Sequence, residues 1–157
     1  MEDLSSSIEK VIHFWKAQNI KIVPKAIEEI LYVSKTNALQ LPGDFIELYR
    51  QANGMRELYP NYTDAEGFLI YPIEAIVSAR EEFGEAAPLG KRKIFIFSDY
   101  LIKCWWYGYE AFDDGSYAIG IVESRDDFRP ITNSLAEFLE LYMVDSDRMY
   151  DCSDGEN

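Results

Sequence analysis

The chain has few of the residues from which catalytic and metal-binding sites are usually built. Its 157 residues include one histidine and two cysteines. Zinc sites draw mainly on Cys and His, and a nucleophilic serine or cysteine needs a base beside it. The lone His13 and the widely separated Cys104 and Cys152 provide neither arrangement, nor a disulfide framework. We therefore expect a non-enzymatic protein without catalytic residues, metal or cofactor, although 28 acidic residues leave a carboxylate pair for glycoside cleavage open.

The sequence is also short of positive charge. Fifteen Lys and Arg stand against 28 Asp and Glu, which gives a formal net charge of -13. A chain this acidic repels the phosphate backbone of nucleic acids and attracts basic surfaces. The charge argues against a nucleic-acid partner and favours a basic protein partner, while simple solubility is the alternative explanation.

Long apolar runs are missing as well, and the first residues lack the basic and then apolar layout of a secretory signal. We expect a cytoplasmic protein that does not bind membranes. Hydrophobic residues make up 48% of the chain, enough for the core of one domain. We predict a single domain over residues 1–144, followed by a flexible acidic tail over residues 145–157.

The clearest helix signal lies at residues 41–54. Pro42 suits a first helical position, Phe45, Leu48 and Tyr49 repeat at helical spacing, and Asn53-Gly54 suits a helix end. Two helices are predicted before it. One covers residues 6–18 and begins at a capping box led by Ser6; the other runs from Pro24 to about residue 37, with Ile27, Ile30 and Leu31 as its apolar stripe.

The second half of the chain has the alternation of β-strands. Strands are predicted at residues 67–71, 94–97, 101–109 and 116–123, with an edge segment at 128–132 that contains Pro130. Residues 113–116 form a hairpin turn signal. Further helices are expected over residues 72–83 and from the capping box at Ser134. This order predicts a single α+β domain, with N-terminal helices and a mainly antiparallel sheet against which helices pack.

Three motifs together are similar to a known family. They are LPxDFxxLYxxxNG at residues 41–54, the strand and turn GFLIYPIEAI at 67–76, and SxxEFL at 134–139. Over roughly residues 25–143 the chain resembles the SUKH superfamily, which groups fungal regulators of cell-wall glucan synthesis with bacterial toxin-immunity proteins. The resemblance implies a non-catalytic interaction domain that neutralises a toxin, or alternatively a regulator or adaptor in cell-wall or glucan synthesis. A carbohydrate-binding or small-molecule-binding protein is a third possibility.

Aromatic and acidic residues occur together in two stretches, which we predict to bind the partner. Strand alternation places Trp105, Tyr107 and Tyr109 on one face and Trp106 on the other, so that one of the two sets belongs to the core. The other set, beside carboxylates, would anchor a basic partner. We expect a monomer or weak homodimer. The predicted partner-binding residues are Tyr59, Tyr62, Asp64, Glu66, Trp105, Tyr107, Tyr109, Glu110, Asp113 and Asp114.

Overall fold

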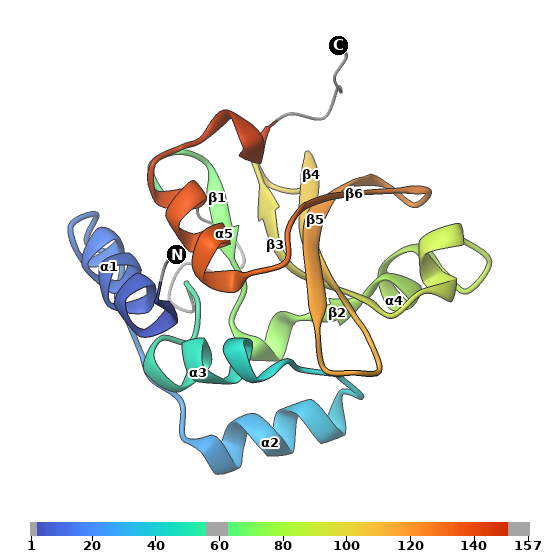
Figure 1. The fold of residues 1–157 in the computed structure, drawn as a ribbon, viewed down its shortest axis with the longest axis horizontal. Helices are drawn as coiled ribbons and strands as arrows, with labels where there is room; N and C mark the ends of the chain where they lie inside the picture. The colour runs from blue at the N-terminus through green and yellow to red at the C-terminus, as the bar shows by residue number, and fades with distance from the viewer. Residues whose placement is uncertain (1–2, 56–62, 151–157) are drawn as a thin grey trace.

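The computed structural model describes residues 3–55 and 63–150. Five α-helices and a six-stranded antiparallel sheet form one α+β domain, as the sequence predicts (Figure 1). The helices are α1 (Leu4–Lys16), α2 (Ile27–Thr36), α3 (Gly43–Gln51), α4 (Ala79–Phe83) and α5 (Leu135–Met143). The strands are β1 (Phe68–Ile70), β2 (Val77–Ser78), β3 (Ile94–Tyr100), β4 (Trp105–Ala111), β5 (Tyr117–Ser124) and β6 (Asp127–Thr132). Short 3₁₀ turns are η1 (Ile73–Ala75), η2 (Pro88–Lys91) and η3 (Asp147–Met149).

The sheet is ordered β1-β3-β4-β5-β6, and β2 pairs with β3 beyond the end of β1. The predicted hairpin between β4 and β5 is confirmed, with Gly115 at a φ of 91° in its turn. The edge position predicted for Pro130 is also confirmed, because it lies in the outermost strand β6. β4 therefore lies in the middle of the sheet.

One face of the sheet carries the main core. The α1, α3 and α5 helices lie on this side (Figure 1), and their large buried side chains include Trp15, Phe45 and Phe138. Trp15 donates a hydrogen bond of 2.8 Å from its Nε1 to the Tyr142 hydroxyl, which ties α1 to α5. A smaller apolar cluster lies around α4 and η2 and contains Ala79, Leu89, Ile94, Val122 and Phe128.

The end of α3 shows why the motifs at residues 41–54 and 67–76 occur together. Gly54 has a φ of 61°, and a Cβ there would lie 2.4 Å from the Tyr71 carbonyl oxygen, so a side chain has no room. The Asn53 side chain accepts a hydrogen bond from the Ile73 amide (2.8 Å) and donates one to Glu74 (3.0 Å). Asn53-Gly54 thus joins α3 directly to the chain that follows β1.

Two helices differ in their bounds from those predicted from the sequence. The helix predicted over residues 72–83 is broken into η1, β2 and α4, because Val77 pairs with Ile96 at the edge of β3. Strand pairing outweighs the helical spacing of its apolar residues there. The first helix begins earlier than predicted, since the Asp3 carboxylate rather than Ser6 accepts the capping hydrogen bond. The closing helix begins at Ser134 as predicted, with its hydroxyl accepting from the Glu137 amide.

The start of the predicted tail is packed against the domain. Met149 in η3 is fully buried, and the Tyr107 hydroxyl donates a hydrogen bond to its carbonyl. Met149, which the sequence assigns to the tail, therefore belongs to the core, and Tyr150 packs partly buried against it. Residues 151–157 lie outside the described part of the chain.

Candidate functional site

The structure separates the ten predicted partner-binding residues. Tyr59 and Tyr62 lie outside the described residues. Three are buried: Asp64, Tyr107 and Tyr109. The five with exposed surface are Glu66, Trp105, Glu110, Asp113 and Asp114.

Tyr107 and Tyr109 point into the main core, and both are fully buried. The Tyr109 ring lies 4.6 Å from that of Phe45 and is stacked at 5.3 Å on Phe95. Burial raises the pKa of the Tyr109 hydroxyl above its ordinary value of 10.0. Trp106, on the opposite face, packs edge-on against Phe83 in the smaller cluster. Neither tyrosine therefore offers surface to a partner.

Asp64 is a structural residue. It is only 6% exposed, and its Oδ1 accepts hydrogen bonds from the backbone amides of Glu66 and Phe68, both at 2.9 Å. The other oxygen accepts a hydrogen bond from the Tyr142 hydroxyl. Burial, and after it the Asp64 charge, raises the pKa of Tyr142. Through Tyr142 this carboxylate fastens the entry to β1 onto α5 and α1.

The exposed members form two surfaces at opposite ends of β4. We call residues Glu66, Tyr100, Leu101, Ile102 and Trp105 the turn surface, and residues Glu110, Phe112, Asp113 and Asp114 the hairpin surface. The seven residues of β4 separate them by roughly 20 Å. The exposed members of the predicted set therefore lie on two separate surfaces.

Acids of the hairpin surface are matched by bases next to them. Arg92 binds both oxygens of Glu110, at 2.9 and 2.8 Å, and Lys93 lies 3.0 Å from Asp113. Hydrogen bonds from Ser116 lower the pKa of Asp114, which keeps it ionised. The pairing of Arg92 and Lys93 with these acids depends on the register of β3 against β4, which pairs Ile94 with Glu110.

The turn surface is built on an unusual backbone. Leu101, Ile102 and Lys103 have φ values of 50°, 54° and 67°, all in the left-handed region. That region strains a β-branched residue such as isoleucine, and such strain persists only where the surroundings hold it. Leu101 is nonetheless 49% exposed and Ile102 69% exposed. The sequence assigns these residues to the start of a strand, and no glycine marks the turn.

Contacts on both sides hold this turn. The Leu101 amide donates to the Gly67 carbonyl at 2.8 Å, and the Trp105 ring is stacked at 4.8 Å on Tyr100. Below the turn, buried Asp99 accepts a hydrogen bond of 2.7 Å from the Tyr71 hydroxyl. Burial raises the pKa of Asp99 above its ordinary value of 3.8. These contacts hold the turn in place, and its Leu101 and Ile102 side chains are exposed to solvent.

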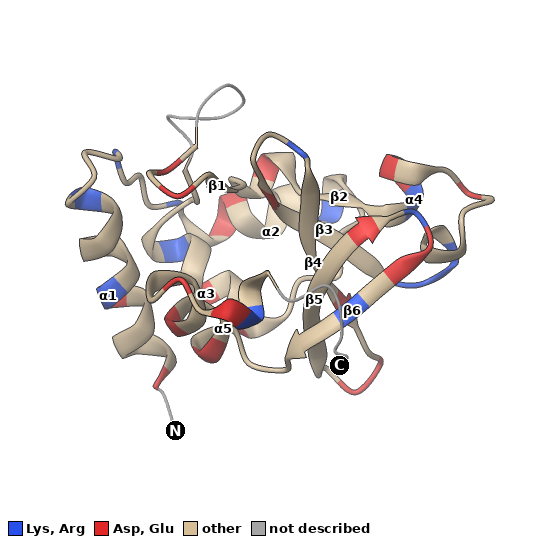
Figure 2. Ribbon diagram, turned by 90° about the horizontal axis from the view of Figure 1, so that it is seen from above, with Lys and Arg blue, Asp and Glu red and all other residues tan. Residues whose placement is uncertain are grey.

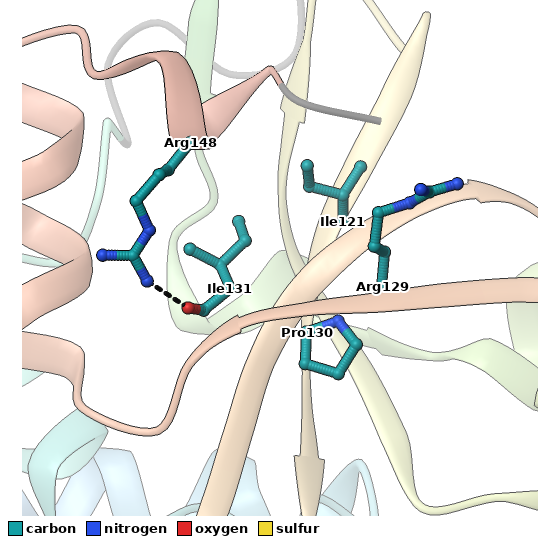
Figure 3. Close-up of a pocket in the computed structure, with 5 residues that line it drawn as sticks. All are labelled: Ile121, Arg129, Pro130, Ile131 and Arg148. Atoms are coloured by element: carbon teal, nitrogen blue, oxygen red, sulfur yellow. Dashed lines mark hydrogen bonds between the residues drawn. The ribbon is translucent and has the colours of Figure 1, made fainter. Parts of the chain in front are cut away.

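A pocket of about 240 Å³ lies beside β6 and is lined by arginines and isoleucines (Figure 3). Figure 3 shows Arg148 donating to the Ile131 carbonyl. The Arg129 guanidinium pairs with Asp127 at 3.2 Å. Both guanidinium groups are thus engaged with neighbouring residues, and Arg148 occupies one carbonyl on the open edge of the sheet.

Within residues 3–55 and 63–150, no group of three or more His, Cys, Asp or Glu side chains is placed to hold a metal ion. In the same part of the chain, no helix has the length and apolar character needed to cross a bilayer.

The comparisons with known proteins give one result for this fold. A search of curated proteins finds no match to the chain. The model of the SMI1 / KNR4 family (SUKH-1) matches residues 25–141, which include α2, α3, the whole sheet and most of α5. The three motifs that carry the resemblance all lie within this range. The chain therefore belongs to the SMI1 / KNR4 family (SUKH-1).

Proposed function

We propose that this chain is a protein-interaction domain of the immunity type, which binds a basic toxin domain in the cytoplasm and neutralises it. The superfamily resemblance implies this role, and the net charge of -13 favours a basic partner. Acidic residues are spread over the helices, the sheet and its turns (Figure 2). Such a distribution attracts a cationic protein from several directions.

The observation that carries the proposal is the turn surface. Stable interfaces depend on a few apolar or aromatic anchors, and exposed Leu101 and Ile102 beside half-buried Trp105 fit that pattern. A rigid anchor also loses little conformational entropy on binding. We assign the anchoring of the partner to this end of β4.

The hairpin surface has a smaller part in the proposal. Glu110 and Asp113 already pair with Arg92 and Lys93, so a basic partner would have to compete with these internal bases. The charge of the whole chain then speeds the encounter, whereas the apolar turn sets the lifetime of the complex.

Affinity capture from the native cell tests the proposal. The bait proteins are the wild type, Ile102→Asp at the turn surface, and Phe112→Asp as a matched control at the hairpin surface, where Phe112 is 41% exposed. We expect the wild type and the control to retain a basic partner. Ile102→Asp should bind it at least about tenfold more weakly, because the change places a charge in an apolar contact.

Salt dependence and the identity of the partner complete the test. The affinity should fall as salt is added, since the attraction is largely electrostatic at long range. Equal binding of the Ile102→Asp protein would contradict the turn surface, and an affinity independent of salt would contradict the electrostatic part. Capture of a glucan-synthesis component would instead support the alternative role as a cell-wall regulator. Thermal stabilisation by sugars would support carbohydrate binding.

A further inference from the structure

The outward side of α2 is apolar and uncovered. The sequence predicts Ile27, Ile30 and Leu31 as a buried stripe, but of these only Ile30 is buried. Leu31 is 53% exposed and its neighbour Tyr32 is 70% exposed. The helix lies at the margin of the molecule, with α3 on its inner side (Figure 1).

Four exposed residues form one line along this outward side. Glu28, Leu31, Tyr32 and Lys35 are spaced at i, i+3, i+4 and i+7, which places them on one helix face, and we call them the α2 stripe. The stripe has an acid at one end, a base at the other and two large apolar side chains between them. Within the described part of the chain, neither Glu28 nor Lys35 forms an ion pair.

We propose that the α2 stripe is the contact surface of a weak homodimer, in which α2 packs antiparallel to α2 of a second copy. Leu31 and Tyr32 lie midway between Glu28 and Lys35. A two-fold axis at this midpoint places Leu31 against Tyr32 of the second copy, twice. It also places Glu28 opposite Lys35 of the second copy, again twice. The stripe is thus complementary to itself in charge and in the placement of its apolar residues.

The charge distribution favours a second copy over a basic protein at this surface. Two chains of net charge -13 repel each other, so they associate where the local charge is least negative. Residues 21–37 hold three lysines and two glutamates, so this region does not share the acidity of the chain. It also offers no excess of negative charge to a cationic partner.

The size of the α2 stripe sets the expected affinity of the dimer. The ten residues of α2 extend over about 15 Å, so a single helix pair buries less than the roughly 1,200 Å² typical of stable complexes. We expect a dissociation constant of roughly 10 μM to 1 mM. The dimer is therefore one that forms at high local concentration.

Sedimentation velocity tests the dimer between roughly 10 μM and 1 mM protein, in about 0.3 M salt to screen the overall repulsion. The wild type should sediment faster as its concentration rises. Leu31→Asp should remain monomeric, with self-association weakened at least about tenfold. Because Leu31 is exposed, the variant should keep the wild-type melting temperature. A wild type that stays monomeric at the highest concentration would overturn the proposal.

A charge exchange tests the antiparallel register. Glu28→Lys and Lys35→Glu should each weaken self-association about threefold to tenfold, because each places like charges opposite one another. Mixed together, the two variants should form a heterodimer, since every facing pair is then complementary. Failure of the mixture to associate would overturn the register. The Ile102→Asp protein should dimerise like the wild type, which separates this proposal from the function assigned to the turn surface.

Discussion

The two ends of strand β4 differ in how they meet solvent. At the hairpin end, Glu110 is held by Arg92 and the turn has a glycine where its backbone is left-handed. At the other end, Leu101 and Ile102 occupy left-handed positions without a glycine and expose apolar side chains. One end is locally relaxed and paired, whereas the other combines strain with exposed apolar surface.

This difference is the reason for assigning the proposed partner contact to the turn end. Strain and apolar exposure both reduce stability or solubility, and they persist together where function requires them. Acidic residues are visible in the sequence at both ends, but internal ion pairs occupy Glu110 and Asp113 at the hairpin end. Exposed and unpaired surface, rather than acidic composition alone, distinguishes the turn end as the candidate interface.

The largest expected effect is a loss of stability at alkaline pH, caused by buried tyrosines that lie under both ends of β4. Burial raises the pKa of Tyr109 under the hairpin end and of Tyr142 under the turn end above 10.0. The folded chain therefore keeps protons that the unfolded chain releases. Stability is unaffected by these groups below a pH of about 10 and is lost as the pH rises above it.

We expect one cooperative unfolding transition in this alkaline range. Near-ultraviolet circular dichroism and tyrosinate absorbance measure it. The part of the tyrosinate absorbance that comes from the buried hydroxyls should appear together with the loss of the near-ultraviolet signal, because these hydroxyls ionise only on unfolding, whereas exposed tyrosines such as Tyr32 ionise in the folded chain. Ionisation of these tyrosines before loss of the tertiary signal would show that their surroundings admit water.

The next largest effect contrasts two neighbouring residues of β4. Tyr109→Ala should lower the free energy of unfolding by about 3–5 kcal/mol, since it leaves a large cavity between Phe45 and Phe95. Glu110→Ala should cost less than about 1 kcal/mol, because its partner Arg92 is 43% exposed and solvent screens the pair. Urea denaturation measures both. Similar losses for the two variants would contradict the assignment of Tyr109 to the core.

Asp64 and Glu66 provide a smaller contrast at the turn end. Asp64→Ala removes the acceptor of three hydrogen bonds and should destabilise the fold by about 2 kcal/mol. Glu66 is exposed, and Glu66→Ala should change stability by less than about 0.5 kcal/mol. Thermal melts of both variants check this. A stable Asp64→Ala protein would return Asp64 to the list of partner-binding candidates.

The smallest effects test backbone strain at the two ends directly. Ile102→Gly should stabilise the fold by about 0.5–1 kcal/mol, because glycine tolerates the left-handed φ of 54°. Gly115→Ala should have the opposite effect, a loss of about 1 kcal/mol. Its φ is 91°, and no atom lies within 4 Å of the added Cβ, so strain alone is responsible. Changes of the same sign in the two variants would contradict the contrast between the ends.

Local sequence signals predict the features that depend on neighbouring residues. Pro42 lies just before α3 as its N-cap, one position earlier than predicted, and Asn53-Gly54 follow its end. The turn before Ser116 predicts the hairpin, and Ser134 caps α5. Each signal consists of a few neighbouring residues whose backbone preferences favour a helix end or a turn. The family resemblance depends on the same local signals.

Which side of each element is buried depends on tertiary contacts. Alternation divides the aromatics of β4 between two faces, but the main-core face is the one under α1, α3 and α5, which takes Tyr107 and Tyr109 inside. Likewise, Asp64 is buried because Tyr142, 78 positions away, donates to it. The pairing of Arg92 with Glu110 follows from strand register. Contacts between distant segments set burial and charge pairing, so the surfaces left for binding emerge only when the chain has folded.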